Sequence, residues 1–379
     1  MEFRQQQINI ATLLVVFFLN IFLLDAALAE TKTIRRPDGS VYVELSMKDG
    51  KKDGQKILYG ADGVVQSVST YKDDLQEGPE TVFWSDGTLQ ARKMYRNGQL
   101  EGEVQYFENK RLVSEQMYKN GKREGLTKFY YDDGALRNEL PYKEGKKEGT
   151  CKFYDSKGTM FLEQEYKNDK REGLSRCYQA FTPVKLDSKF MEKLHAEEGY
   201  APGQLVMEVS FVADKREGIG KYYSNTGRVV YEEEFKGGVL DGVCKGYYED
   251  ATLKSTEPYA NGKLNGLAKY YYKNGKLSSL VSFAEDKRQG VTRLYSEAGD
   301  FESEEPYQND LLQGEKKSYY PNGKLKEIKP YIKDNTSGMW RFFYESGKVR
   351  AESLYEDGRT VKNWVCYDEN GKVTNDVTY

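Results

Sequence analysis

Nine basic residues stand at matching places along the sequence, each two residues before an aromatic residue. Side chains two residues apart point to the same face of an extended strand, so they predict a basic stripe beside a ridge of rings. Such a stripe would suit an anionic polymer, a lipid head group or an acidic peptide. Alternatively, the lysine stems cover the rings and pair with glutamates such as Glu233, Glu257 and Glu305 across the sheet. The nine are Lys128, Lys152, Arg176, Lys221, Lys245, Lys269, Arg293, Lys317 and Arg341.

Residues suited to catalysis are scarce. His195 is the only histidine, so a Ser-His-Asp or Cys-His arrangement has one candidate base and a histidine-rich metal site is excluded. Neither a phosphate-binding loop nor a dinucleotide-binding glycine motif occurs in a strand-to-helix setting. Glu232, Glu233 and Glu234 have the chemistry of a glycosidase pair, but solvated strand residues are the simpler interpretation. We therefore expect no enzyme, and no catalytic, cofactor-binding or metal-binding residues.

Composition narrows the classes further. The 379 residues carry 57 basic and 60 acidic side chains, a balance that gives no general attraction to nucleic acid. Aromatic residues make up 13 %, which favours a folded chain over a disordered one. The spacings of the four cysteines match no zinc pattern, so we expect small buried thiols at repeat positions. They are Cys151, Cys177, Cys244 and Cys366.

A repeated glycine organises these residues. Its steps are 24 residues long, apart from one step of 23 and one of 45, which indicates a repeat architecture. Counting from each glycine as position zero, position five is always aromatic, and position seventeen is aromatic in every complete 24-residue repeat. The basic residues above occupy position three. The glycines are Gly54, Gly78, Gly102, Gly125, Gly149, Gly173, Gly218, Gly242, Gly266, Gly290, Gly314 and Gly338.

Two turns divide each repeat. Pro321-Asn322-Gly323 suits a three-residue loop, a type I turn closed by a glycine at positive φ, which would pair position five with position eleven. Asn261-Gly262 marks a second turn after position seventeen. We expect positions one, five, eleven and seventeen to share one face. The predicted fold is all-β, an elongated array of antiparallel β-hairpins of about 24 residues each, stabilised by contacts between neighbouring repeats.

Three segments resemble a known repeat. They read Tyr-Tyr-Tyr-Lys-Asn-Gly-Lys-Leu at 270–277, Tyr-Tyr-Pro-Asn-Gly-Lys-Leu at 319–325 and Tyr-Lys-Asn-Gly-Lys-Arg-Glu-Gly at 118–125. The pattern is similar to the bacterial variant of the MORN (membrane occupation and recognition nexus) repeat and covers nearly all of 34–379. The resemblance implies an extended curved β array that acts as a scaffold or binding surface and brings no catalytic residues. Some bacterial members are described as antitoxin-like, which implies a cytoplasmic role.

The 45-residue step contains an insertion, 179–203, flanked by Pro183 and Pro202. A short helix is predicted inside it, with an apolar stripe. It is interpreted as a decoration of the array edge or as a partner-binding element or hinge. Its candidate contact residues are Phe190, Met191, Leu194 and His195. The expected segments are a leader at 1–29, repeats at 30–178, the insertion at 179–203 and repeats at 204–379.

Residues 1–29 are typical of an export signal. An apolar run from Leu13 to Leu24 precedes Ala27-Leu28-Ala29, a small-x-small cleavage pattern. We expect cleavage near Ala29 and export to the periplasm, the outer surface or the medium. An uncleaved membrane anchor is the alternative.

The expected function is an exported, non-enzymatic scaffold for a protein partner or a cell-envelope component, a membrane surface included. One alternative is a binder of an anionic polymer, carbohydrate or lipid head group through the basic and tyrosine side chains. An antitoxin-like protein and an enzyme at the insertion are the others.

Overall fold

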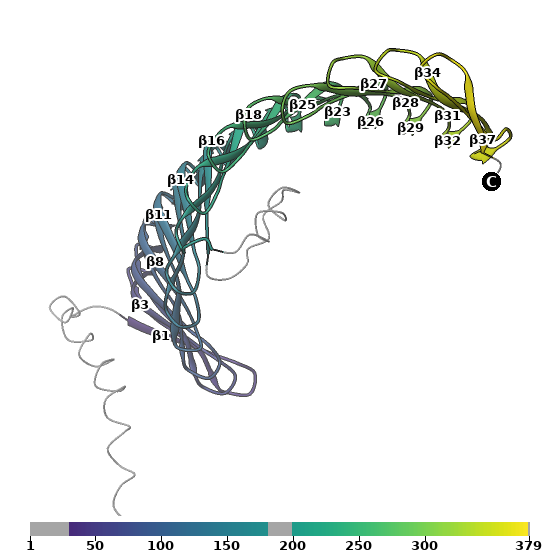
Figure 1. Cartoon of the computed structure of the whole chain (residues 1–379). Coiled ribbons are helices and arrows are strands. Elements are labelled where there is room, and N and C mark those ends of the chain that lie inside the picture. The colour runs from purple at the N-terminus through teal and green to yellow at the C-terminus, as the bar shows by residue number, and fades with distance from the viewer. Residues whose placement is uncertain (1–29, 181–198, 378–379) are drawn as a thin grey trace, which may run out of the picture. The chain divides into compact units, whose positions relative to one another are not determined.

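A computed structural model describes residues 30–180 and 199–377. Within these ranges the chain forms β-strands and turns, with no α-helix, and the all-β prediction is confirmed (Figure 1). The predicted leader and the predicted short helix, with Phe190, Met191, Leu194 and His195, lie outside the described residues. The described ranges contain no helix with the length and apolarity to cross a membrane.

The chain divides into two compact units, and each consists of antiparallel strands. The first comprises the described residues up to Gly158, with Lys167–Asp169. The second comprises Thr159–Tyr166 and the described residues from Lys170 onward.

The strands of the first unit are β1 (Glu30–Arg35), β2 (Val41–Lys48), β3 (Lys51–Tyr59), β4 (Val65–Lys72), β5 (Leu75–Phe83), β6 (Leu89–Arg96), β7 (Gln99–Leu100), β8 (Gly102–Glu108), β9 (Arg111–Lys119), β10 (Lys122–Arg123), β11 (Gly125–Tyr130), β12 (Leu136–Lys143), β13 (Lys146–Lys147) and β14 (Gly149–Tyr154). Those of the second are β15 (Met160–Lys167), β16 (Lys170–Tyr178), β17 (Leu205–Val212), β18 (Lys215–Tyr223), β19 (Val229–Lys236), β20 (Val239–Leu240), β21 (Gly242–Tyr247), β22 (Leu253–Ala260), β23 (Lys263–Leu264), β24 (Gly266–Tyr271), β25 (Leu277–Ala284), β26 (Lys287–Arg288), β27 (Gly290–Tyr295), β28 (Phe301–Gln308), β29 (Leu311–Leu312), β30 (Gly314–Tyr319), β31 (Leu325–Ile332), β32 (Asn335–Thr336), β33 (Gly338–Phe343), β34 (Val349–Glu356), β35 (Arg359–Thr360), β36 (Trp364–Tyr367) and β37 (Val373–Val377).

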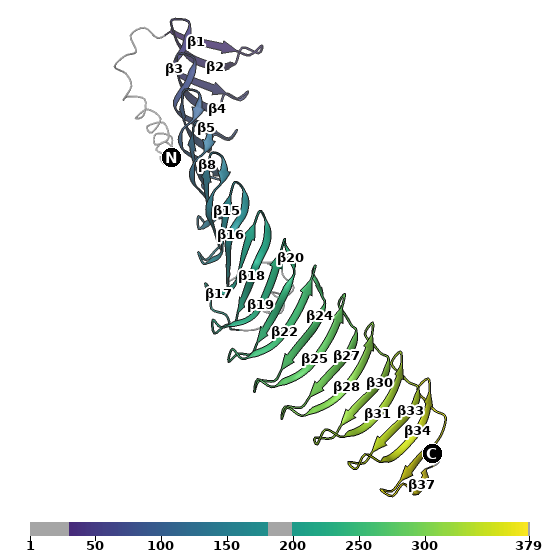
Figure 2. The same cartoon turned by 90° about the horizontal axis from the view of Figure 1, so that it is seen from above.

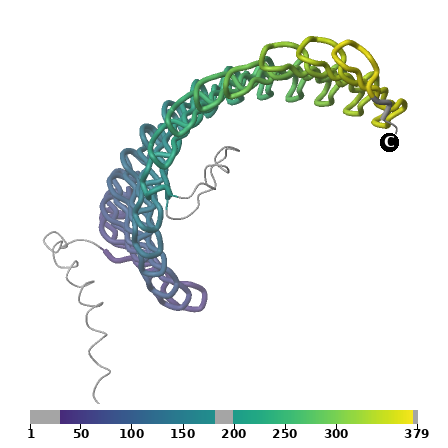
Figure 3. The backbone as a smooth tube through the Cα atoms, in the orientation of Figure 1, coloured from purple at the N-terminus to yellow at the C-terminus, as the bar shows by residue number. Residues whose placement is uncertain are grey.

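Within each unit, a repeat is one hairpin that pairs with its neighbouring hairpins. In β24–β25, Gly266 lies opposite Phe283 and Tyr271 lies opposite Leu277, so position five pairs with position eleven as predicted. β25 then pairs with β27 of the following repeat. Figure 2 shows β22, β24, β25, β27 and β28 following one another along the second unit, and Figure 3 traces the same path of the chain. Sequence order therefore equals spatial order within the unit.

The first turn has the predicted geometry. At Pro321-Asn322-Gly323, the Tyr320 amide donates to the Lys324 carbonyl at 2.8 Å and the Gly323 amide donates to the Tyr320 carbonyl at 2.8 Å. Gly323 has a φ of 79°. This is a type I turn followed by a left-handed residue, for which glycine has no steric cost. Proline, whose φ is fixed near −65°, suits the start of such a turn.

The second turn places two successive residues at positive φ, as a type I′ hairpin turn requires. In Asn261-Gly262 the φ values are 51° and 82°. Other repeats carry aspartate at the second place, such as Asp286 with a φ of 70°. Its carboxylate accepts a hydrogen bond from the Leu264 amide at 2.8 Å, which offsets the strain and joins the second turns of two neighbouring repeats.

A recurring β-bulge in the hairpins sets which side chains share a face. The register shifts between Tyr270 and Tyr271, because the two strands contribute unequal numbers of residues there. The extra residue interrupts the alternation of side chains along the second strand. Positions one, three, five, eleven, fourteen and sixteen therefore form one face, here called the ladder face. Positions two, four, thirteen, fifteen and seventeen form the other, here called the ring face.

Position seventeen thus lies on the ring face, and the prediction that it shares a face with position five is wrong. Position two, on the same face, is a small or compact residue in eight of the twelve glycine-led repeats. Val104, Cys151, Cys244 and Ala268 are each 0 % exposed. A Cβ added at Gly220, also at position two, would meet the Phe235 ring at 3.3 Å, so the ring covers the backbone there.

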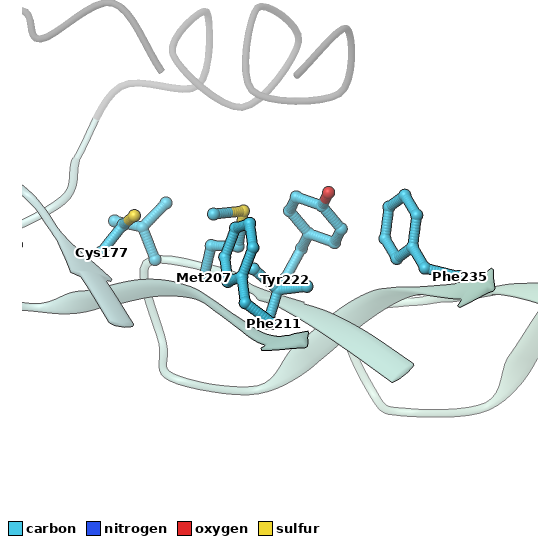
Figure 4. Packing of buried hydrophobic residues seen from close by; sticks show 7 residues of the cluster. Cys177, Met207, Phe211, Tyr222 and Phe235 are labelled. Atoms are coloured by element: carbon cyan, nitrogen blue, oxygen red, sulfur yellow. The ribbon is translucent and has the colours of Figure 1, made fainter. Parts of the chain in front are cut away.

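A cluster of buried hydrophobic residues lies on the ring face of the second unit. Its members include Met207, Phe211, Tyr222 and Phe235, which Figure 4 shows on the same side of the sheet as Cys177. The prediction of buried thiols is confirmed for Cys151, Cys177 and Cys244, whereas Cys366 is half-buried. Burial raises the pKa of the Cys177 thiol to about 12.

The insertion interrupts one first turn without disturbing the hairpin around it. β16 and β17 pair from Gly173 opposite Phe211 to Tyr178 opposite Leu205, with the bulge in its usual place. The Gln179 amide donates to the Gln204 carbonyl at 2.8 Å. The repeat register resumes at Tyr200, before the boundary at Gly203 expected from the sequence. The Tyr200 hydroxyl donates to the Tyr223 carbonyl at 2.8 Å, the same contact that Tyr248 makes to Tyr271.

Candidate functional site

All nine basic residues predicted from the sequence lie at position three of the ladder face, where they form the basic column. Each is opposite a position-fourteen residue on a neighbouring strand. Lys245, for example, lies opposite Glu232 on one side and Thr256 on the other. In the second unit this row continues through Lys269, opposite both Thr256 and Leu280. The basic column is therefore not continuous, because position fourteen separates its members.

Position fourteen supplies an acidic column that was not recognised in the sequence. Each of its glutamates lies fifteen residues before a position-five tyrosine, a constant spacing that would have revealed it. These residues are Glu44, Glu115, Glu139, Glu163, Glu208, Glu232, Glu304 and Glu352.

The glutamates first proposed as partners, Glu233, Glu257 and Glu305, lie one residue further, on the ring face. Glu233 accepts a hydrogen bond from Tyr222 there, and burial raises the pKa of its carboxyl. Glu305 accepts one from Tyr307 at 2.9 Å. The expected pairing of these three residues with the basic column is therefore wrong. The β-bulge that moves position seventeen to the ring face moves position fifteen with it.

Tyrosines at position five donate hydrogen bonds to the acidic column of the preceding repeat. The Tyr154 hydroxyl lies 2.9 Å from Glu139, and the Tyr223 hydroxyl lies 2.7 Å from Glu208. Burial, with the hydrogen bond to the carboxylate, raises the pKa of Tyr154 to about 12. The same bond occurs at Tyr59, Tyr130, Tyr178, Tyr247 and Tyr367.

The three phenylalanines at position five each follow a position fourteen that has no carboxylate. Phe83 follows Val68, and Phe343 follows Ile328, at the same spacing of fifteen residues. Phe107 follows Arg92, whose guanidinium lies 5.6 Å from the ring centroid as a cation–π contact. The hydroxyl is thus paired with an acidic acceptor, while the ring alone is sufficient for packing.

Ion pairs connect part of the basic column to the acidic column. Arg176 lies 2.8 Å from Glu163 and 3.6 Å from Glu208. Arg341 lies 3.1 Å from Glu352. Lys245 lies 3.8 Å from Glu232, and Arg293 lies 3.4 Å from Glu304. Carboxylates therefore neutralise much of the positive charge of this face.

Two successive repeats of the second unit lack the position-fourteen glutamate that accepts the tyrosine hydroxyl elsewhere. Position fourteen is Thr256 in one repeat and Leu280 in the next, although both are followed at the usual spacing by tyrosines, Tyr271 and Tyr295. Among the described residues, the hydroxyls of these two tyrosines have no hydrogen-bond partner. Lys269 between them is exposed and lies within 4.0 Å of no carboxylate in the same part of the chain. We call the surface around these residues the ladder gap.

An exposed aliphatic column runs beside this row at position one. Val243, Leu267 and Val291 are 42 %, 44 % and 37 % exposed. Each is two residues before a member of the basic column on the same strand and therefore shares its face. The ladder face of these repeats thus combines apolar and cationic side chains. The described residues hold no group of three or more histidine, cysteine or acidic side chains arranged for a metal ion.

Comparison with known proteins identifies the repeat. The sequence profile of the MORN repeat variant matches residues 123–144, 147–168, 264–285, 312–333 and 337–357. No curated protein matches the chain.

Two solved structures align with most of the chain, but their TM-scores are too low to support a structural comparison. A chain of "Crystal Structure of TcdB2-TccC3-Cdc42" has 9 % identity, covers 89 % of this chain and has a TM-score of 0.13. A chain of "Crystal Structure of TcdB2-TccC3-TEV" has 12 % identity, covers 92 % and has a TM-score of 0.14. This chain spans 23 % and 24 % of their lengths.

Proposed function

From the premise that this chain is built from MORN-variant repeats, we propose that it is a non-enzymatic scaffold whose ladder face binds a protein partner. The observation that supports this proposal is the column of exposed aliphatic side chains at position one. Ile219, Val243, Leu267 and Val291 occupy this place in four successive repeats and are 37–51 % exposed. Apolar side chains gathered on one face, bordered by charges, are typical of a protein interface.

The proposal includes export. The N-terminal sequence suits cleavage near Ala29 and delivery to the periplasm, the cell surface or the medium, where the partner would be a soluble protein or an envelope component. An uncleaved anchor would place the same face beside the membrane.

Affinity capture with the full chain tests both the binding of a protein partner and the export. The tagged protein, expressed with residues 1–29 in its own source organism, is recovered from envelope, soluble and medium fractions, and its N-terminus is sequenced. We expect an N-terminus at Glu30 and one stoichiometric partner.

Ile219→Ser with Leu267→Ser should lower partner recovery by about tenfold, since two anchors of the exposed column are lost. A matched control, Leu75→Ser, changes an aliphatic residue that is 50 % exposed but outside this column and should leave recovery unchanged. Equal recovery by all three proteins would contradict the proposed face. Absence of any stoichiometric partner would contradict the scaffold.

A further inference from the structure

We propose that the ladder gap binds an acidic, amphipathic segment of a protein partner, whose carboxylates replace the glutamates absent at Thr256 and Leu280. This inference rests on the proposed function and specifies which part of the ladder face makes the contact and with what chemistry. In repeats with a complete set of side chains, a carboxylate lies between two basic residues and accepts a hydrogen bond from a tyrosine hydroxyl. Glu232 lies between Lys221 and Lys245 and accepts from Tyr247 at 2.9 Å.

The ladder gap keeps its donors and lacks the acceptors. Lys269 at position three and Tyr271 and Tyr295 at position five have no carboxylate partner among the described residues. Lys245 and Arg293 border the gap on either side and pair with Glu232 and Glu304. Elsewhere the residue at position five loses its hydroxyl when the carboxylate is absent, as at Phe83 and Phe343. Two tyrosines that keep their hydroxyls are therefore consistent with an acceptor supplied from outside the chain. Hydrogen bonds from such donors to a carboxylate are charge-assisted and short.

The spacing of the two places suits a helix. Thr256 and Leu280 lie two strands apart, with Lys269 between them in the row. Neighbouring strands are about 4.8 Å apart, so the two places are separated by about 10 Å. Residues seven apart on an α-helix are about 10.5 Å apart on one side of it. A helix lying across the strands can therefore present two glutamates, seven residues apart, to the two places.

The aliphatic column makes a peptide a better occupant than a phosphate-bearing lipid or an acidic polysaccharide. Val243, Leu267 and Val291 lie beside the three cations on the same strands and are exposed. An amphipathic helix would place leucines on this column and glutamates on the row of cations, so both surfaces are used. A sugar chain would contact the cations and leave the aliphatic side chains in water. A membrane surface would cover them, but its mobile head groups would not hold two carboxylates at the fixed spacing of the two places.

A binding experiment with the full chain tests the proposal. The probe is a fluorescein-labelled helical peptide of about 18 residues, with two glutamates seven residues apart and a stripe of leucines. Fluorescence anisotropy measures its affinity at low and moderate salt. A peptide with both glutamates changed to glutamine should bind at least tenfold more weakly, since a tenfold change is the scale of one charge-assisted contact.

Two protein variants form a matched pair. Lys269→Gln removes the cation in the middle of the ladder gap and should weaken binding by about tenfold. Lys221→Gln makes the same change at the same repeat position between Glu208 and Glu232, and should leave the affinity unchanged.

A third variant, Thr256→Glu with Leu280→Glu, should fill the ladder gap with the chain's own carboxylates and abolish binding while keeping or raising the melting temperature. This variant does not depend on removing any native contact of the fold.

Equal affinities for Lys269→Gln and Lys221→Gln would overturn the proposal, as would equal binding of the glutamate and glutamine peptides. So would binding to phosphatidylserine vesicles that depends on Lys269 when the peptide does not bind. If these outcomes occur while Ile219→Ser with Leu267→Ser still loses its partner, the scaffold stands and only the ladder gap assignment fails.

Discussion

At the scale of single residues, position five is always aromatic. Whether its ring carries a hydroxyl is related to the residue at position fourteen of the preceding repeat. Tyr154 donates to Glu139, whereas Phe343 follows Ile328. A lone hydroxyl on a half-buried ring contributes to stability only when its acceptor is in place. The hydroxyl of Tyr271, which has no partner among the described residues, is thus available for an intermolecular contact.

Removing the hydroxyl should therefore have unequal effects at two equivalent positions. We expect Tyr154→Phe to lower the free energy of unfolding by about 1 kcal/mol, because it removes a hydrogen bond to a carboxylate. Tyr271→Phe should change it by less than about 0.5 kcal/mol. Urea denaturation followed by tryptophan fluorescence and circular dichroism measures both. Equal destabilisation by the two substitutions would show that the bond to Glu139 adds no stability beyond that of a hydroxyl without a partner.

At the scale of the hairpin, the sequence predicts the turns well because their residues have few alternatives. Asn261-Gly262 suits a type I′ turn, and Pro321-Asn322-Gly323 suits a type I turn with a left-handed glycine. Both turns are confirmed. The repeat period and the pairing of position five with position eleven follow from them.

The faces were predicted less well, for one physical reason. A β-bulge adds a residue to one strand, and no residue type marks the extra residue as clearly as glycine marks a turn. With unbroken alternation, positions fifteen and seventeen would share the face of position five. This reasoning led to Glu233 in place of Glu232 and put the second aromatic column on the wrong face. The ladder gap could not be predicted before the acidic column was recognised.

Alkaline pH should weaken the hairpins through their tyrosines. Burial, with the bonds to glutamate, raises the pKa of Tyr154, Tyr178 and Tyr247 to about 12, above the ordinary value near 10. Between these values the unfolded chain has lost the tyrosine protons that the folded chain keeps. The free energy of unfolding must then fall as pH rises. We expect it to be constant near pH 9 and to fall between about pH 10 and pH 12.

Urea denaturation at a series of pH values measures this fall. The triple variant Tyr154→Phe, Tyr178→Phe and Tyr247→Phe should show a shallower slope than the unmodified chain. A slope that the triple variant does not change would contradict the role of these tyrosines.

At the scale of the whole molecule, the repeats within each unit are stabilised by their neighbours. In the second unit the pairing runs from one hairpin to the next, and β25 pairs with β24 and β27. Stability is then close to a sum over neighbouring repeats, and damage in one repeat should remain local.

Ala268→Asp tests this locality. It buries a carboxylate at a site that is 0 % exposed on the ring face, which is strongly unfavourable. Hydrogen exchange should show lost protection in β22, β24, β25 and β27, while β18 and β19 stay protected. Leu267→Asp, one residue earlier on the ladder face, is the control and should change protection little. Loss of protection throughout the chain would show a single cooperative unit instead.

The hairpin that carries the insertion indicates how a repeat protein of this kind can gain new segments of sequence. Tyr178 and Leu205 pair as their counterparts do elsewhere, although the segment between them is far longer than an ordinary turn. New sequence can thus be grafted after position six, where Gln179 keeps the backbone hydrogen bonds of an ordinary first turn, at little cost to the surrounding strands. Every first turn in the array is a candidate entry point for a foreign domain, so an ancestor could have gained new binding partners one loop at a time.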